Sequence, residues 1–211
     1  MGMFSRLFGA DSETRSIENP TIASSASLDE WLSFFGVQSG NVSLPAVTIE
    51  TALEVPAVFD AVGFLSRTLA ALPLHAFRRT EGEAEREDGN LQMLLNEAPN
   101  PEWSSFAWRQ YSWQQLFTGG RMVSWIERKG VRPIAIWPMD PTQTTIVRRG
   151  GKKFYRFDGI EYPASDVIDV PFMLKPNQLD AYGPIMKGKK AIALAIAMND
   201  FPGQFFAGGG I

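Results

Sequence analysis

Residues 121–170 decide the fold class, with the sequence RMVSWIERKGVRPIAIWPMDPTQTTIVRRGGKKFYRFDGIEYPASDVIDV. Short runs of β-branched and aromatic residues alternate there with turn signals such as Lys129-Gly130 and Asp158-Gly159. The runs have the length of strands, and glycine tolerates the left-handed backbone of tight hairpin turns. This stretch therefore predicts a β-rich unit, with strands at residues 121–128, 133–138, 144–148, 153–157, 160–162 and 167–170.

Helical patterns lie on both sides of the β-rich stretch. Residues 49–72 carry apolar side chains at three- and four-residue spacing, among them Phe59 and Leu65, and predict one helix that buries this stripe. Pro56 suits the first turn of a helix, where its missing N–H needs no partner. Further helices are predicted at residues 91–96, 105–118 and 185–206, the last interrupted at Pro202-Gly203. Serines at 104 and 105 can cap the helix at 105–118, and glycines at 119 and 120 end it.

The composition fits an ordered α+β protein. The chain has 211 residues, of which 45% are hydrophobic, so it can bury a core. Residues 10–28 are rich in serine, threonine, asparagine and alanine, and we expect residues 1–45 to form a mobile N-terminal arm. An α+β domain is expected at residues 46–172, then a loop and a long helix at 173–211. No apolar run reaches the length of a membrane span, so no membrane partner is expected.

The residues that usually carry catalysis are scarce. There is no cysteine and only one histidine, His75, which we interpret as a packed or edge-strand residue. No Walker loop or other cofactor motif occurs, and no cofactor or metal is expected. A small hydrolase using carboxylates around Asp166 is one alternative, but turns flank these acids, which favours solvated side chains. The acids concerned are Asp158, Glu161, Asp166 and Asp169.

Positive charge is unevenly distributed. The whole chain has a net charge of -3, whereas residues 121–156 are rich in lysine and arginine. A nucleic-acid-binding module that uses this segment is a second alternative. Three lysines at the start of the last predicted helix are candidates for contact with DNA phosphates or with a neighbouring subunit: Lys187, Lys189 and Lys190.

Four stretches, in this order, make the chain resemble the HK97-like family of bacteriophage portal proteins. The first is VTIETALEVPAVFDAVGFLSRTLAALPLHAFRR at residues 47–79, and the second is LLNEAPNP at 94–101. The third is LFTGGRMVSWIERKGVRPIAIWPMDP at 116–141, and the fourth is YGPIMKGKKAIALAIAMNDFPGQFF at 182–206. The sequence departs from the family pattern at Gly120-Arg121-Met122, which replaces an asparagine-aromatic step.

The resemblance implies a structural subunit and not an enzyme. In the family, subunits form a ring at one capsid vertex, usually a dodecamer, through which double-stranded DNA passes without sequence specificity. The expected partners are the major capsid protein, the terminase large subunit and a head-tail adaptor. The expected location is the virion of a phage or gene transfer agent, after assembly in the host cytoplasm. Residues 46–172 would form a portal-like wing, and residues 173–211 would end in a stem-type helix before the clip. A head-tail adaptor is a third alternative.

Overall fold

The computed structural model describes the backbone of residues 45–80 and 82–207. These residues belong to one unit, Leu44–Ile211, which is distinct from Met1–Ser43. The predicted N-terminal arm therefore lies outside the described residues, except for Pro45. No helix in the described ranges is long and apolar enough to cross a membrane.

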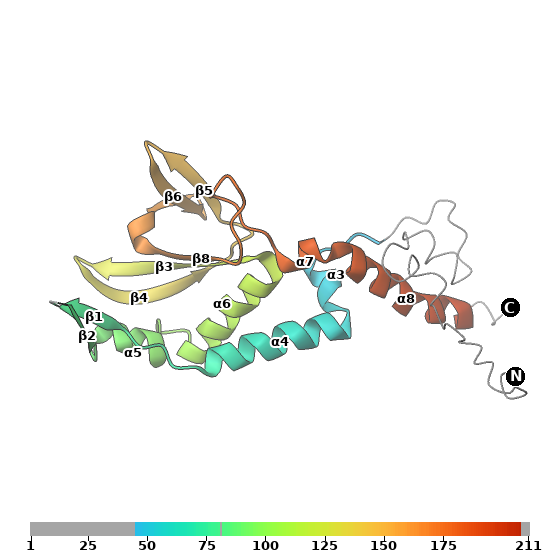
Figure 1. Cartoon of the computed structure of the whole chain (residues 1–211), viewed down its shortest axis with the longest axis horizontal. Helices are drawn as coiled ribbons and strands as arrows, with labels where there is room; N and C mark the ends of the chain where they lie inside the picture. Colours follow the sequence, from blue (N-terminus) through green and yellow to red (C-terminus); the bar gives the residue numbers. More distant parts are fainter. Residues whose placement is uncertain (1–44, 81, 208–211) are drawn as a thin grey trace, which may run out of the picture. The chain divides into compact units, whose positions relative to one another are not determined.

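Two stacked antiparallel sheets and a layer of helices make up the unit (Figure 1). The central sheet has the strand order β4-β3-β8, so β3 is hydrogen-bonded on both edges. The outer sheet, β5-β6-β7, is a meander of neighbouring strands. The strands are β3 (Arg121–Lys129), β4 (Arg132–Met139), β5 (Thr145–Arg149), β6 (Lys152–Phe157), β7 (Ile160–Pro163) and β8 (Val167–Pro171).

Successive side chains along β3 point to opposite faces of the central sheet, and each face packs against another layer. Val123 faces the outer sheet, where it joins a core with Met139 and Tyr155. Ser124 faces the helices, and its hydroxyl accepts a hydrogen bond of 3.1 Å from the indole of Trp108. The α+β class and the six strands predicted between residues 121 and 170 are confirmed. The helices beneath the central sheet are α5 (Asn90–Asn96) and α6 (Ser105–Gly119).

The predicted helix over residues 49–72 is in fact two helices. The first, α3 (Ile49–Leu53), begins with a reciprocal cap between Thr48 and Thr51. The second, α4 (Pro56–Ala71), begins at Pro56, which lacks an N–H to continue the preceding helix. The prediction of one helix was therefore wrong, whereas the prediction that Pro56 lies in the first turn of a helix is confirmed.

Helix α4 buries only part of the predicted apolar stripe, together with small side chains. Val62, Ser66 and Ala70 are buried and face α6, which packs closely along α4. Phe59 and Leu65 of the predicted stripe are 59% and 43% exposed. Close helix approach requires small residues at the contact, so the bulky residues of α4 lie on its outer surface. The predicted burial is confirmed for Val62 and was wrong for Phe59 and Leu65.

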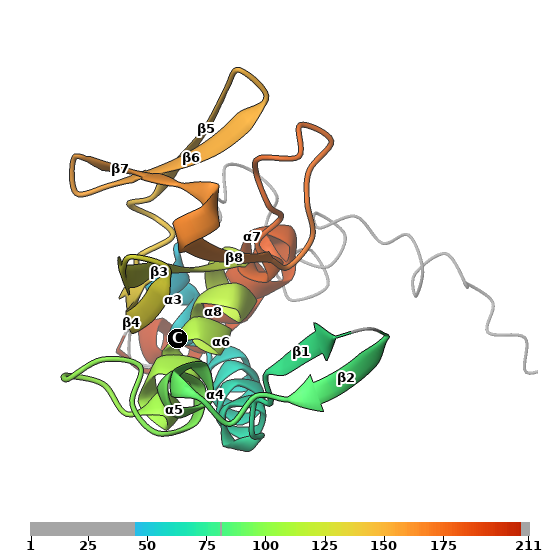
Figure 2. The same cartoon turned by 90° about the vertical axis from the view of Figure 1, so that its left-hand side faces the viewer.

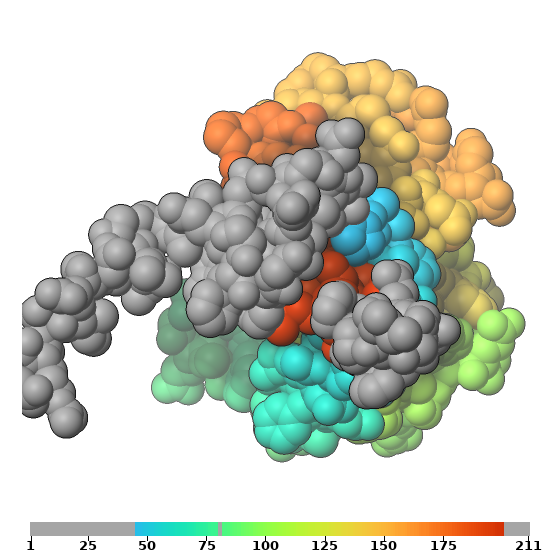
Figure 3. All heavy atoms as spheres, turned by 90° about the vertical axis from the view of Figure 1, so that its right-hand side faces the viewer, coloured from blue at the N-terminus to red at the C-terminus, as the bar shows by residue number. Residues whose placement is uncertain are grey.

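A short hairpin and the last two helices complete the unit. The hairpin pairs β1 (Phe77–Thr80) with β2 (Glu83–Arg86). The final segment forms α7 (Pro184–Lys187) and α8 (Lys189–Ala207), separated at Gly188. The helix runs through Pro202, so the predicted interruption there was wrong and the break lies at Gly188. Figure 3 shows α3, in blue, beside α8, in red, and the two helices are in contact.

Candidate functional site: the junction between the sheets and the last helices

Gly120 and Gly183 allow the end of α6 to lie against the start of α7. Gly120 follows α6 with a positive φ of 88°, a conformation that favours glycine. A Cβ added there would lie 2.3 Å from the carbonyl oxygen of Tyr182 and 2.6 Å from the Cα of Gly183. The backbone N–H of Phe172 also donates to the Gly120 carbonyl at 2.9 Å, which ties the end of β8 to the end of α6. The third and fourth family-like stretches therefore meet backbone to backbone.

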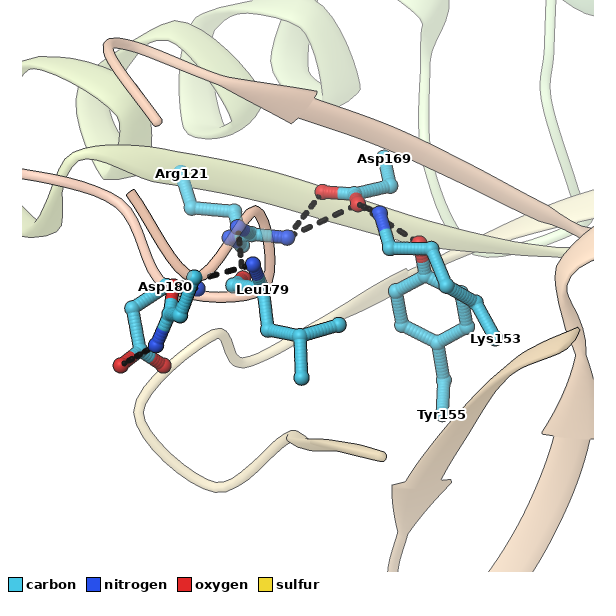
Figure 4. A network of polar contacts seen from close by, with 7 residues as sticks. Arg121, Lys153, Tyr155, Asp169, Leu179 and Asp180 are labelled. Carbon is cyan, nitrogen blue, oxygen red and sulfur yellow. Dashed lines mark hydrogen bonds and ion pairs between the residues drawn. The ribbon is translucent and has the colours of Figure 1, made fainter. Parts of the chain in front are cut away.

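Arg121, the next residue, is a buried cation that joins three segments (Figure 4). Its guanidinium donates to both carboxylate oxygens of Asp169, at 2.6 and 2.8 Å, and also to the backbone carbonyl of Leu179. The Arg121 and Asp169 side chains are only 8% and 7% exposed. This pair connects β3 to β8 and holds the loop of residues 173–182 that leads to α7.

The outer sheet contributes two further donors to Asp169. The Tyr155 hydroxyl donates at 2.6 Å and the Lys153 ammonium at 3.2 Å. Burial of Tyr155, together with its hydrogen bond to Asp169, raises the pKa of this phenol well above its usual value. We call Arg121, Lys153, Tyr155 and Asp169 the junction network. It joins both sheets and the loop, and its carboxylate already accepts from three side chains.

The predicted carboxylate cluster does not form a common site. Asp166 pairs with Arg128 at 3.1 Å, and Glu161 pairs with Arg149 and Arg156. Asp169 was predicted to be solvated, and this was wrong, because it lies on the inner face of β8 between the sheets. The described residues contain no group of three or more acidic, histidine or cysteine side chains that could hold a metal.

The three candidate lysines lie at the α7–α8 break but point to different surroundings. The ammonium of Lys187 lies 4.0 Å from the ring centroid of Tyr182, within reach of a cation–π interaction. Lys189 and Lys190 line a shallow hollow of about 280 Å³ together with Pro45 and Val47. All three lysines are exposed. Lys189 and Lys190 therefore share one surface, whereas Lys187 lies over Tyr182 at the end of the loop that leads to α7.

His75 is neither packed nor part of an edge strand, so the prediction for this residue was wrong. It is exposed in the extended segment before β1, and its Nδ1 lies 3.4 Å from the amide nitrogen of Gln92. Side-chain amides of α5 hold this segment, because Asn96 bonds both the N–H and the carbonyl of Leu74, at 2.9 and 2.6 Å.

Sequence reasoning missed two buried polar residues that organise the helices. Arg109 lies on α6 and donates to the carbonyl of Leu72 at 2.6 Å, which caps the C-terminal end of α4. Desolvation by burial lowers the pKa of Arg109. Asn100 is 4% exposed and bonds Ile136 on the edge of β4. Two signals were available in the sequence. Arg109 lies within a predicted helix that is otherwise rich in apolar residues, and Asn100 lies between Pro99 and Pro101.

The fold and the junction define an α+β subunit in which paired charges connect structural layers. Residues 56–211 match the family model described as phage portal protein, and the chain belongs to that family. The prediction from the four sequence stretches is confirmed.

Individual relatives agree with this assignment. The chain is 28% identical over 180 residues to the probable portal protein of Streptomyces phage phiC31, covering 77% of this chain and 39% of the relative. It is 26% identical over 188 residues to the portal protein of Enterobacteria phage HK97, covering 82% of this chain and 44% of the relative. The chain thus spans less than half the length of these relatives.

Solved structures share the fold at low sequence identity. One describes the neck of an empty gene transfer agent particle, with a TM-score of 0.59 and 15% identity, covering 82% of this chain and 50% of the other. Another describes the virion of a native gene transfer agent particle, with a TM-score of 0.59 and 11% identity, covering 83% of this chain and 49% of the other.

Proposed function

We propose that the chain is a subunit of a closed ring at one capsid vertex, through which double-stranded DNA enters during packaging and leaves during ejection. The match of residues 56–211 to the portal family carries this proposal. The fold shared with proteins in gene transfer agent particles supports a place in the virion, reached after assembly in the host cytoplasm. A dodecamer is the stoichiometry we propose.

The parts of the chain have separate roles in this proposal. Residues 46–172 form the outer wing, and the segment that begins at residue 173 forms a loop and a stem-like helix. The junction network supports this arrangement, because Arg121 holds the central sheet to the loop that leads into α7 and α8, and Asp169 accepts from Lys153 and Tyr155 of the outer sheet. The proposed partners of the ring are the major capsid protein, the terminase large subunit and a head-tail adaptor.

Lys187, Lys189 and Lys190 are proposed to contact passing DNA or a neighbouring subunit. They are exposed where α7 gives way to α8, the segment that we assign to the stem. Their contact with DNA would be electrostatic and therefore independent of base sequence. The chain is acidic overall, with a net charge of -3, which suits a conduit that must not hold phosphates tightly.

The rival functions have less support. A nucleic-acid-binding module would use the basic segment 121–156, but Arg121, Arg128 and Lys153 of this segment already pair with carboxylates. A hydrolase would need an available carboxylate near Asp166, whereas Asp166 is bonded to Arg128. A head-tail adaptor is disfavoured by the family match.

Immunogold labelling of particles from the source organism tests the proposed function. An antibody against residues 10–40 is applied to intact and disrupted particles, which are then viewed by negative-stain electron microscopy. Label at one vertex beside the tail is the expected result. Label over the whole shell, or none on either form, contradicts the proposal. Salt-sensitive DNA binding by the isolated chain would then favour the nucleic-acid-binding module.

A further inference from the structure

Helix α4 is apolar on the side that faces away from α6. Only Asp60 and Arg67 are charged among its 16 residues. A helix that is apolar all round is normally buried on all sides, whereas α4 packs on α6 with one side and leaves the other exposed. An arc of about 100° on the exposed side contains no charged residue. We call its members, all exposed, the α4 patch: Ala57, Ala61, Phe64, Leu65, Thr68 and the C-cap residue Leu72.

The α4 patch has the size of a binding surface. Its three large side chains, Phe64, Leu65 and Leu72, are 66%, 43% and 54% exposed. Together with the small residues between them they present about 500 Å² of mostly apolar surface. Apolar patches this large on a soluble subunit mark interaction sites, so we expect a partner to cover this side of α4.

A second apolar patch lies where β8 leads into the loop of residues 173–182. Phe172, Met173 and Leu174 are consecutive, and all three side chains are exposed. Their backbone is nevertheless ordered, because the Tyr182 N–H donates to the Met173 carbonyl at 2.8 Å and Leu174 forms an antiparallel bridge with Ala181. An apolar segment that is already ordered loses little conformational entropy on binding. We call Phe172, Met173 and Leu174 the loop patch.

The two patches lie on opposite sides of the described unit. Figure 1 and Figure 2 both show α4, in teal, below α6, and the loop of residues 173–182, in orange, above the central sheet. The buried residues of α4 face α6, so the α4 patch faces away from the loop. The two patches therefore cannot cover each other within one chain, but they can do so between successive copies.

We propose that the loop patch of one subunit packs on the α4 patch of the next subunit in the ring. A ring needs a head-to-tail interface, in which two different surfaces of the same chain meet. The α4 patch and the loop patch supply such a pair, and the repeat covers both patches in every subunit. This inference names the interface within the ring, and it rests on the proposed function.

The combined area of the patches fits an interface between two copies. The loop patch adds about 300 Å², so the pair would bury about 800 Å² of apolar surface. Apolar atoms contribute roughly 60% of the area buried in protein interfaces, which gives a total of about 1,300 Å². Stable interfaces bury about 1,200–2,000 Å². DNA is a poor partner for either patch, because neither patch contains a cation to contact phosphates.

Two aspartate substitutions test the contact by sedimentation velocity of the full chain. Phe64→Asp alters only the α4 patch and Met173→Asp only the loop patch, and both side chains are exposed, so the fold should be retained in circular dichroism. Each variant alone should self-associate more than about tenfold more weakly than the parent chain, because the contact would bury an unpaired carboxylate. Val131→Asp, at an exposed apolar residue between β3 and β4, is the control and should leave self-association unchanged.

The mixture of the two variants gives the specific signature. The intact loop patch of Phe64→Asp meets the intact α4 patch of Met173→Asp, so one good interface forms and dimers should return. Both remaining ends of such a dimer carry a substituted patch, so nothing larger than a dimer should form. A mixture that stays monomeric would mean that the two patches do not meet each other, and it would overturn the inference.

Cysteine cross-linking tests the same contact without adding charge. The chain has no cysteine, so a single-cysteine variant has one reactive thiol. Leu65→Cys mixed with Met173→Cys and treated with a short bismaleimide should give a dimer in which mass spectrometry finds positions 65 and 173 joined. Lys129→Cys in place of Met173→Cys is the control and should give far less dimer. Efficient dimer formation by Leu65→Cys alone would mean that α4 meets α4 of a second copy, which overturns the inference.

The outcomes separate this inference from the proposed function. Unchanged self-association of both aspartate variants means that another protein covers the patches, and it overturns the interface while vertex labelling still supports the portal function. Absence of self-association by the parent chain at its highest soluble concentration also overturns the interface. Dimers in the mixture of aspartate variants support the interface even before particles are labelled.

Discussion

Asn100 and Ile136 are joined as if they were neighbours in a sheet. The Asn100 side chain donates to the Ile136 carbonyl at 2.8 Å, while the Ile136 N–H donates to the Pro99 carbonyl at 2.7 Å. The side-chain amide oxygen of Asn100 accepts from the backbone N–H groups of Glu102 and Trp103, both at 2.9 Å. The Pro-Asn-Pro turn therefore covers the outer edge of β4, which would otherwise be open to pairing.

Replacing Asn100 with alanine should destabilise the chain by about 2–4 kcal/mol, because three hydrogen bonds are lost and buried backbone groups are left without partners. Urea unfolding followed by circular dichroism measures the change. Asn177 is a matched control, since it makes similar turn bonds to Leu179 and Asp180 in an exposed loop. Asn177→Ala should cost about 1 kcal/mol or less. Equal losses in the two variants would contradict the edge-covering role.

Gly120→Ala should be more damaging than Gly130→Ala. Both glycines have positive φ, of 88° and 64°, so both substitutions strain the backbone. Only at Gly120 would the new Cβ also collide, at 2.3 Å from the Tyr182 carbonyl oxygen, whereas it meets nothing within 4 Å at Gly130. The difference between the two free energies of unfolding should be about 1–3 kcal/mol. Equal free energies of unfolding for the two variants would mean that the loop of residues 173–182 moves away from the new Cβ.

Tyr155 makes stability depend on pH in the alkaline range. Its pKa is raised in the folded state, so the folded chain holds the phenolic proton more tightly than the unfolded chain does. The stabilisation is therefore complete below the unfolded value of about 10 and is lost as the pH rises above it. Tyr155→Phe should be less stable than the parent at pH 8, and the gap should narrow above pH 10. A constant gap from pH 8 to 11 in thermal unfolding would refute this linkage.

The closeness of α4 to α6 can be tested at Ser66. This residue is 2% exposed and faces α6, so Ser66→Leu should force the helices apart at a cost of about 1–3 kcal/mol. Phe64, two residues away, is 66% exposed, and Phe64→Ser should change stability by about 0.5 kcal/mol or less. A stabilising Ser66→Leu, measured by urea unfolding, would show that the contact holds a void.

Reversing charge at the α7–α8 break should impair DNA packaging without preventing folding. The triple variant K187E/K189E/K190E should lower the DNase-protected DNA per particle by at least about twofold, since repulsion replaces attraction for phosphates or for an acidic neighbour. Quantitative amplification of protected DNA measures packaging, and circular dichroism checks the fold. The variant K129E is a control for one exposed charge elsewhere. Normal packaging by the triple variant would remove these lysines from the proposal.

The sequence was sufficient to predict helices and strands where a single hydrophobic periodicity dominates. The strands between residues 121 and 170 follow from alternation and turn glycines, α5 follows from its apolar spacing, and α6 follows from its serine cap and its spacing. The exposure of Phe59 and Leu65 on α4 could not be predicted, because the apolar spacing does not reveal that small residues face α6. The buried state of Asp169 was also hidden, since its partners Arg121 and Tyr155 are distant in sequence and meet it only when the sheets stack.

The strand order has a consequence for folding during synthesis. The outer sheet pairs neighbours along the chain, but β3 must wait for β8, which leaves the ribosome only after the whole β5–β7 meander. Contacts this distant in sequence form slowly, so we expect the closure of β8 onto β3 to limit the rate of folding. Until Pro171 has emerged, one edge of β3 and the cationic side chain of Arg121 remain open. A nascent chain at that length is the form that most needs a chaperone.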